Sequence, residues 1–193
     1  MILDVVKYGH PVLRQKGARI EKITPEIKKL IADMLETMHE RHGVGLAAQQ
    51  VGHALQLTVL DVRDVQDRPS TLELKGKPAD VKEIMPLVLI NPEIKPVGEM
   101  VAGSEGCLSF PEIFAEISRP GSVDVKALSE KLKPVEFRAG GLLSRAIQHE
   151  ADHLNGILFI DRMTRKVKEE MRDELDAMQA ATKAELEKAK HSK

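Results

Sequence analysis

His149, Glu150 and His153 lie in a segment that begins at Gly140 and ends at Gly156. Its apolar residues recur at helical spacing, and the asparagine and glycine at its end are typical of a helix terminus. On an α-helix the two histidines of this H-E-x-x-H pattern lie on one face, one turn apart, where two ring nitrogens can bind one metal ion. The segment therefore predicts a helix with a metal site on one face; two hydrogen-bonded core histidines are the alternative.

A catalytic metal of this type needs three protein ligands and an open fourth position. A histidine six residues after His153 would complete the longer protease pattern, but that residue is Phe159. Glu169 and Glu170 are possible ligands by spacing, although they lie in a charged stretch typical of a solvated surface. Cys107, the single cysteine, offers a thiolate. We favour Cys107 as the third ligand; a buried structural cysteine and an independent nucleophile are the alternatives.

A run of small residues between Gly43 and Gln50 reads G-V-G-L-A-A-Q-Q. Small side chains allow the main chain to approach another part of the molecule closely, and a helix end followed by packed alanines would also explain them. The run lacks the Lys-Ser/Thr of a phosphate-binding loop and the glycine spacing of a dinucleotide-binding loop. Nucleotide binding is therefore not supported.

The rest of the chain predicts an α+β fold. Thr24 and Pro25 mark the start of an amphipathic helix that Gly43 ends. Residues 61–86 are polar and interrupted by proline and glycine, so we expect an exposed insertion loop there. Beyond Thr164 a highly charged sequence with a thin apolar stripe predicts a long tail helix. Short strands are expected at Leu55–Val62, Leu87–Ile90, Ile117, Val123–Val125 and Val135–Phe137. We expect short mixed or antiparallel strands around the central helix that carries H-E-x-x-H.

Composition excludes several classes of protein. Lys and Arg number 29 against 30 Asp and Glu, so no overall positive field attracts nucleic acid or an acidic membrane. Aromatic residues make up 3% and Trp is absent, which disfavours stacking platforms for single-stranded nucleic acid. The longest apolar stretch, Ile84–Ile90, is too short to span a bilayer, and the N-terminus lacks the features of a signal peptide. With one cysteine and no internal disulfide, we expect a cytoplasmic protein without membrane contact or sequence-specific nucleic-acid binding.

Three segments together resemble the peptide deformylase family: G-V-G-L-A-A-Q-Q at 43–50, E-G-C-L-S at 105–109 and Q-H-E-A-D-H at 148–153. All three signature motifs occur in the family's order, and the similarity extends from Lys7 to Asp161. The resemblance implies an α+β fold and removal of the formyl group from N-formyl-methionyl peptides, the nascent chains. It also implies one divalent metal ion, Fe²⁺ by expectation, with Zn²⁺ or another divalent ion possible.

The resemblance further assigns chemical roles to four residues. Cys107, His149 and His153 would hold the metal ion. Glu150, next to the first histidine, would act as the general acid and base.

Five more residues receive roles in the same way. Gln50 and the main-chain N–H of Leu108 would face the oxyanion that forms during hydrolysis. Val44, Gly45 and Glu105 would line the path of the peptide. By the same resemblance, residues 1–163 would form the catalytic part, and the charged tail at 164–193 would help the protein to dock on the ribosome.

Two other functions are compatible with the residues alone. A zinc endopeptidase would use Glu150 and the same histidines on internal peptide bonds, with Glu169 or Glu170 as third ligand. A non-enzymatic protein would use Cys107 and the histidines to close a structural metal site or simply as core residues.

Overall fold

The computed structural model describes all residues from Met1 to Lys193. Its sheet has seven strands in the order β1-β2-β5-β6-β7-β3-β4, and each strand pairs antiparallel with its neighbours. The strands are β1 (Gly45–Ala47), β2 (Leu57–Leu60), β3 (Ser70–Leu74), β4 (Lys77–Ala79), β5 (Leu87–Cys107), β6 (Phe110–Leu128) and β7 (Pro134–Gly140). The helices are α1 (Pro25–Glu40), α2 (Gly141–Leu154), α3 (Arg165–Glu170) and α4 (Arg172–His191), with short 3-10 helices η1 (Pro11–Arg14), η2 (Ala48–Val51), η3 (Val81–Ile84) and η4 (Phe159–Arg162). The predicted α+β class is confirmed.

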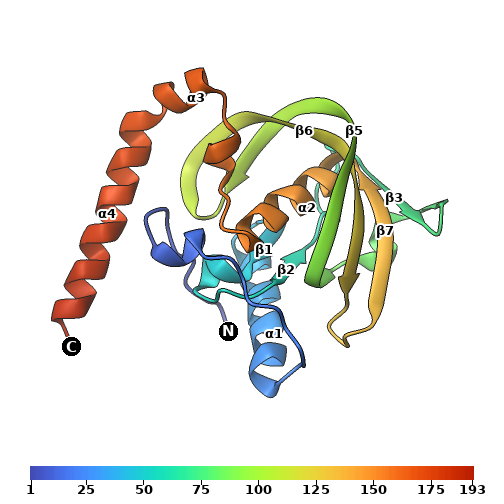
Figure 1. Ribbon diagram of the computed structural model, residues 1–193, viewed down its shortest axis with the longest axis horizontal. Helices are drawn as coiled ribbons and strands as arrows, with labels where there is room; N and C mark the ends of the chain where they lie inside the picture. The colour runs from blue at the N-terminus through green and yellow to red at the C-terminus, as the bar shows by residue number, and fades with distance from the viewer.

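Helix α2 lies at the centre of the molecule, with the curved sheet around it (Figure 1). Every residue from Leu142 to Leu154 is buried. Leu143 and Ile147 belong to the same apolar core as Val123 of β6. A helix that is buried on all sides must pair each of its polar side chains inside the protein. Several polar side chains of α2 are accordingly held by other elements, among them Arg145, His149 and Asp152.

Helix α1 begins and ends close to where the sequence predicts. The Thr24 hydroxyl accepts a hydrogen bond from the main-chain N–H of Ile27, which caps the first turn. Met34 and Met38 on its buried face belong to a core cluster with Leu46 of β1. This packing anchors the start of the glycine-rich run that follows the helix.

The strands β5 and β6 form one long ribbon of 21 and 19 residues. The prediction of short strands in this region is wrong, because main-chain pairing continues through stretches whose side chains show no simple alternation. The pairing shifts register at three places, between Ile90 and Glu93, Val97 and Met100, and Gly106 and Cys107. Such irregularities allow a ribbon to bend. The ribbon arches over α2 and brings its tip close to that helix (Figure 1).

Residues 61–86 are not the exposed insertion loop that their composition predicts. They include strands β3 and β4 and the 3-10 helix η3, and β3 pairs with β7 in the sheet. Leu72 and Met85 are buried in the core that surrounds α2. Lys75 and Gly76, between β3 and β4, both have positive φ angles, as two-residue hairpin turns require. The proline and glycine residues of this region thus lie in and around a β-hairpin, and they do not indicate an unstructured loop.

The C-terminal segment forms two helices, α3 and α4, separated at Met171, where one helix was predicted. The Thr164 hydroxyl caps the first of them. Leu175 of α4 is buried in a cluster with Leu13 and Phe159, so the base of the tail packs on the body of the protein. The rest of α4 runs along one side of the molecule to an exposed end (Figure 1). No helix of the structure combines the length and apolarity needed to cross a membrane.

Candidate active site

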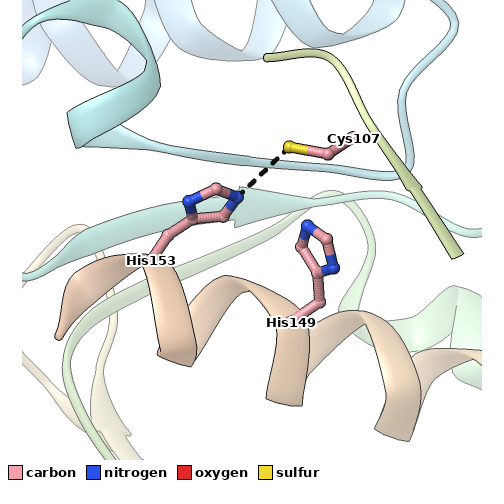
Figure 2. A group of neighbouring side chains, drawn as sticks. All are labelled: Cys107, His149 and His153. Carbon is pink, nitrogen blue, oxygen red and sulfur yellow. Dashed lines mark hydrogen bonds between the residues drawn. The ribbon is translucent and has the colours of Figure 1, made fainter. Parts of the chain in front are cut away.

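Cys107, His149 and His153 meet at the point where the tip of the β5–β6 ribbon approaches α2. Their sulfur and ring-nitrogen atoms all lie within 4.8 Å of one another. The Cys107 Sγ atom is 3.4 Å from Nε2 of His153. Figure 2 shows both imidazole rings rising from α2 towards the sulfur. The two histidines come from consecutive turns of one helix, whereas the cysteine is brought to them by the ribbon.

This donor set fits a divalent metal ion. One sulfur and two imidazole nitrogens are ligands that zinc and ferrous iron both accept. Both histidines are buried, and Oε2 of Glu150, the residue next to His149, has no hydrogen-bond partner in the protein. Unpartnered buried polar atoms are rare and concentrate at functional sites. Three protein ligands also leave a fourth position for a reacting group.

Glu169 and Glu170, the alternative third ligands, lie elsewhere. Both are exposed on α3, and Glu169 lies 3.5 Å from Arg165 on the same helix. Neither belongs to the group of atoms that surrounds the two histidines. The endopeptidase interpretation therefore loses its third ligand.

Glu105 fixes the orientation of the His149 ring through a hydrogen bond to its Nδ1 atom. The His149 Nδ1–H donates to Oε1 of Glu105 at 2.9 Å, which leaves Nε2 of the ring free for a metal. Arg119 and Arg145 donate to Oε2 of Glu105 at 2.6 and 2.8 Å. Burial acts to raise the pKa of Glu105, but the hydrogen bonds from His149 and Arg119 lower it to about 2. The carboxylate of Glu105 is thus buried among cationic groups, and its place along the peptide path stays a prediction.

Asp152 extends the same network across α2. Arg119 donates to its Oδ2 at 2.9 Å, and Arg162 donates to both of its carboxylate oxygens at 2.6 and 2.7 Å. Asp152 lies within the third sequence motif, whereas Arg119 and Arg162 lie outside all three. A signal was available for Arg119, because it continues the buried alternate positions of β6 that begin at Ile113. A charged residue at such a position needs partners inside the protein.

Glu150 follows His149 on α2, and its side chain is buried, with Oε2 enclosed and without a hydrogen-bond partner. Burial raises its pKa to about 7, although the charges of His149 and Arg119 act in the opposite direction. The main chain of Gly45 approaches so closely that a Cβ there would lie 2.7 Å from Oε1 of Glu150. Only glycine permits this approach, which accounts for the second glycine of the small-residue run. A carboxyl group of this kind can gain or lose a proton near neutral pH.

Gln50 is held in one orientation by the main chain. Its Oε1 accepts a hydrogen bond from the N–H of Ala47 at 2.9 Å. The Nε2 group therefore points the other way, towards Sγ of Cys107 at 3.5 Å and Oγ of Ser109 at 3.4 Å. Both contacts are long, so the N–H groups of this amide retain donor capacity beside the metal-binding atoms.

Leu108 connects β5 to β6 directly after Cys107. Its side chain lies against the main chain of Gly43, where an added Cβ would be 3.0 Å from a Leu108 methyl group. Val44, which is half-buried, follows Gly43 and directly precedes Gly45, the first residue of β1. The sequence-predicted residues 43–50, 105–108 and 149–153 thus converge on one place in the fold.

Comparison with known proteins gives a consistent result. Residues 2–169 match the family described as Polypeptide deformylase. The peptide deformylase of Methylacidiphilum infernorum is 48% identical over 176 residues, which cover 91% of this chain and 92% of that protein. The peptide deformylase of Opitutus terrae is 42% identical over 186 residues, which cover 95% of this chain and 96% of that protein.

Solved structures show the same similarity in three dimensions. Peptide deformylase 1B of Arabidopsis thaliana, in complex with an inhibitor, superposes with a TM-score of 0.81 at 36% identity and covers 95% of this chain and 93% of its own. A peptide deformylase from Synechococcus elongatus, in complex with actinonin, has a TM-score of 0.75 at 38% identity over 91% of this chain and 85% of its own. Because sequence, fold and the convergent motifs agree over nearly the whole length, the chain belongs to the peptide deformylase family, the hydrolases that remove the formyl group from the N-terminus of newly made polypeptides.

Proposed function

We propose that this protein hydrolyses the formyl group of N-formyl-methionyl peptides with a divalent metal ion held by Cys107, His149 and His153. The observation that carries this proposal is the convergence of those three donors within 4.8 Å beside the unpartnered Oε2 of Glu150. When bound, the ion supplies Lewis-acid activation of water and of the formyl carbonyl at neutral pH. The family resemblance favours Fe²⁺, and the same ligands also suit Zn²⁺ or another divalent ion.

Glu150 moves the proton in both halves of the reaction. Its Oε2 has no partner in the protein, so it can accept a proton from the water that attacks the formyl carbon. The C–N bond then breaks, and the same oxygen gives that proton to the departing amine nitrogen, with release of formate. A carboxyl group whose pKa is about 7 is suited to both steps at neutral pH.

Gln50 and the main-chain N–H of Leu108 stabilise the oxyanion that develops on the formyl oxygen. The support for Gln50 is the hydrogen bond from Ala47, which turns its Nε2 group towards Cys107. Donors fixed in advance stabilise the tetrahedral transition state more than the planar amide, and so they increase the rate.

The peptide follows β1. This strand stands at one edge of the sheet and pairs only with β2. Its free edge offers main-chain N–H and C=O groups that can pair with an extended peptide. Gly45, the first residue of this strand, lies against Glu150, and Val44 precedes it. We therefore place the substrate main chain along these two residues.

Product analysis tests this function against its rivals. Protein loaded anaerobically with Fe²⁺ or Zn²⁺ is incubated with a formyl-Met-Ala peptide and, separately, with a longer blocked peptide. We expect formate and a free methionine amine from the first and no internal cleavage of the second. Internal cleavage would favour an endopeptidase, and bound metal without any turnover would favour a structural site. The variants Glu169→Ala and Glu170→Ala should keep both metal and activity.

We further propose that the protein acts in the cytoplasm on nascent chains, with residues 1–163 carrying the chemistry and residues 164–193 contacting the ribosome. Every residue to which we assign a role in metal binding or hydrolysis lies before residue 163. The last turn of α4 is basic, with Lys188, Lys190 and His191, which suits a polyanionic surface. Co-sedimentation with ribosomes before and after removal of the exposed end of α4 tests this contact.

A further inference from the structure

The N-terminal segment 6–8 bonds to both sides of the candidate site. The main-chain N–H of Val6 donates to the carbonyl oxygen of Gln50 at 2.9 Å. Two residues later, the N–H of Tyr8 donates to the carbonyl oxygen of Ser109, also at 2.9 Å. One short segment therefore joins η2, which carries one oxyanion donor, to the turn that carries the other.

Lys7 adds a third bond from its side chain. Its Nζ donates to the main-chain oxygen of Leu108 at 3.2 Å. The ammonium group is half-buried and forms its hydrogen bond with this carbonyl instead of a carboxylate. Burial and the nearby charge of Arg41 lower the pKa of Lys7, although the charge of Cys107 acts in the opposite direction. Partial desolvation of the cation without a carboxylate partner costs free energy. The position of Lys7 is therefore better explained by its hydrogen bond to the turn than by a gain for the ammonium group itself.

Tyr8 fixes the same segment to the core. Its ring stacks on Phe110 with centroids 4.8 Å apart, and Phe110 meets Phe159 edge to face at 5.1 Å. Phe110 and Phe159 are each 1% exposed. The Tyr8 end of the segment is thus packed against Phe110, the residue that directly follows the Cys107–Ser109 turn.

We propose that residues 6–8 form a strap that sets the separation between Gln50 and the Cys107–Ser109 turn, and that Lys7 is a positioning residue for deformylation. This inference rests on the proposed function, because the separation matters only if an oxyanion forms between the Gln50 amide and the Leu108 N–H. Oxyanion donors act through exact placement, and a misplacement of about 1 Å can lower a rate by ~10²-fold. The loss falls on the transition state, so a loosened strap lowers kcat and leaves KM nearly unchanged.

Three variants test the strap. Lys7→Met keeps the length of the side chain but removes the donor, Lys7→Arg keeps a donor, and Lys28→Met is a matched control on the exposed side of α1. In metal-loaded protein we expect Lys7→Met to lower kcat about tenfold with KM within about twofold. Lys7→Arg should recover most of that loss, and Lys28→Met should match the wild type. Metal content and Tm should be the same in all four proteins.

Hydrogen exchange gives a readout that is independent of turnover. In Lys7→Met the amides of Val6 and Tyr8 should exchange faster than in the wild type, and in Lys7→Arg they should not. Full kcat in Lys7→Met, with an active wild type, would overturn the strap and leave the proposed function intact. An equal loss of kcat in Lys7→Met and Lys7→Arg, together with lower Tm or metal content, would show a merely structural role and also overturn it. Absence of formate release by the wild type would overturn the proposed function itself.

Discussion

Glycine residues make room for the charged side chains of the site. Gly45 lets β1 approach Glu150, and Gly103 lets β5 pass the guanidinium group of Arg145, where an added Cβ would meet Nε at 2.9 Å. The first contact places a carboxyl group against a main chain, and the second allows Arg145 to reach Glu105. At the scale of single residues, the chemistry therefore depends on close approach as much as on the reactive groups.

Replacement of Glu150 should separate catalysis from metal binding. Glu150→Gln keeps the size of the side chain but cannot accept a proton from water, so we expect kcat to fall by ~10²-fold or more. Metal content should remain at the wild-type level, because Glu150 is outside the Cys107, His149 and His153 group. Elemental analysis of the purified variant and a formate assay measure the two quantities. Near-normal turnover with full metal content would show that Glu150 is not the general acid and base.

Replacement of Cys107 should affect metal and activity together. Cys107→Ala leaves two histidines, which bind a divalent ion more weakly than three ligands do. We expect metal occupancy and formate release to fall in parallel, whereas Glu169→Ala, which alters an exposed residue of α3, should change neither. Metal titration of both variants makes the comparison. A Cys107→Ala protein that kept its metal would show that the third ligand is a different residue.

Charged side chains connect the elements that build the site. Glu105 belongs to β5, Arg119 to β6, and Arg145 and Asp152 to α2. Their hydrogen bonds, at 2.6–2.9 Å, tie the ribbon to the helix on the side of His149 away from the metal-binding atoms. Breaking a buried pair by removing one partner leaves an uncompensated charge. The arrangement of elements around the metal site is consequently held by charge as well as by apolar packing.

Truncation of the tail should have effects that depend on where it is made. Removal of residues 183–193 leaves Leu175 and Thr182 in their buried positions, so turnover of small formyl peptides and Tm should not change. Removal of residues 165–193 uncovers the cluster that contains Leu13 and Phe159. We expect that deletion to lower the free energy of unfolding by ~2 kcal/mol or more, the contribution of one buried leucine.

Urea denaturation and a formate assay measure both effects of truncation. Equal stability of the two shortened proteins would contradict the packing role of Leu175. Ribosome co-sedimentation of the 183–193 deletion tests the second role of the tail, and unchanged co-sedimentation would count against it.

The molecule as a whole is nearly neutral, with a formal charge of −1, so its pH stability depends on individual buried groups more than on net repulsion. Asp61 is one such group, because its side chain is 7% exposed and joins the end of β2 to α1. Arg63 donates to it at 2.6 Å and His39 lies 2.9 Å from it. The hydrogen bond with Arg63 overcomes the effect of burial and lowers the pKa of Asp61 to about 2.

Asp61→Asn should destabilise the protein at neutral pH and less so in acid. A carboxyl group with a lowered folded-state pKa stabilises the protein above its unfolded pKa of about 4, and this stabilisation disappears as the pH falls towards about 2. We expect a loss of at most ~2 kcal/mol at pH 7, because Arg63 is partly solvated, and a smaller loss near pH 3. Urea denaturation at both pH values tests this, with Asp67→Asn, at an exposed position, as control. An equal loss at both pH values would contradict the argument.

Local features could be predicted from the sequence alone. The ends of α1 and α2 follow from Thr24, Pro25, Gly140 and Asn155, because helix caps depend on residues within one turn. The pairing of two histidines on one helix face is equally local, since the spacing of four residues determines it. The family resemblance also rests on short contiguous motifs, and the comparisons confirm it.

Only the tertiary structure decided which distant residues meet. Cys107 and Glu169 were both possible third ligands, and the ribbon brings Cys107 to His153 across 46 residues of sequence. Long-range contacts also pair Glu105 with His149, and they place strands β3 and β4, which lie within residues 61–86, in the sheet. The physical reason is that strand pairing uses main-chain groups, which every residue except proline carries in full. The pattern of side chains therefore predicts where a helix begins and ends. It does not predict how far two strands pair, or which side chain at the end of a strand pair lies in the site.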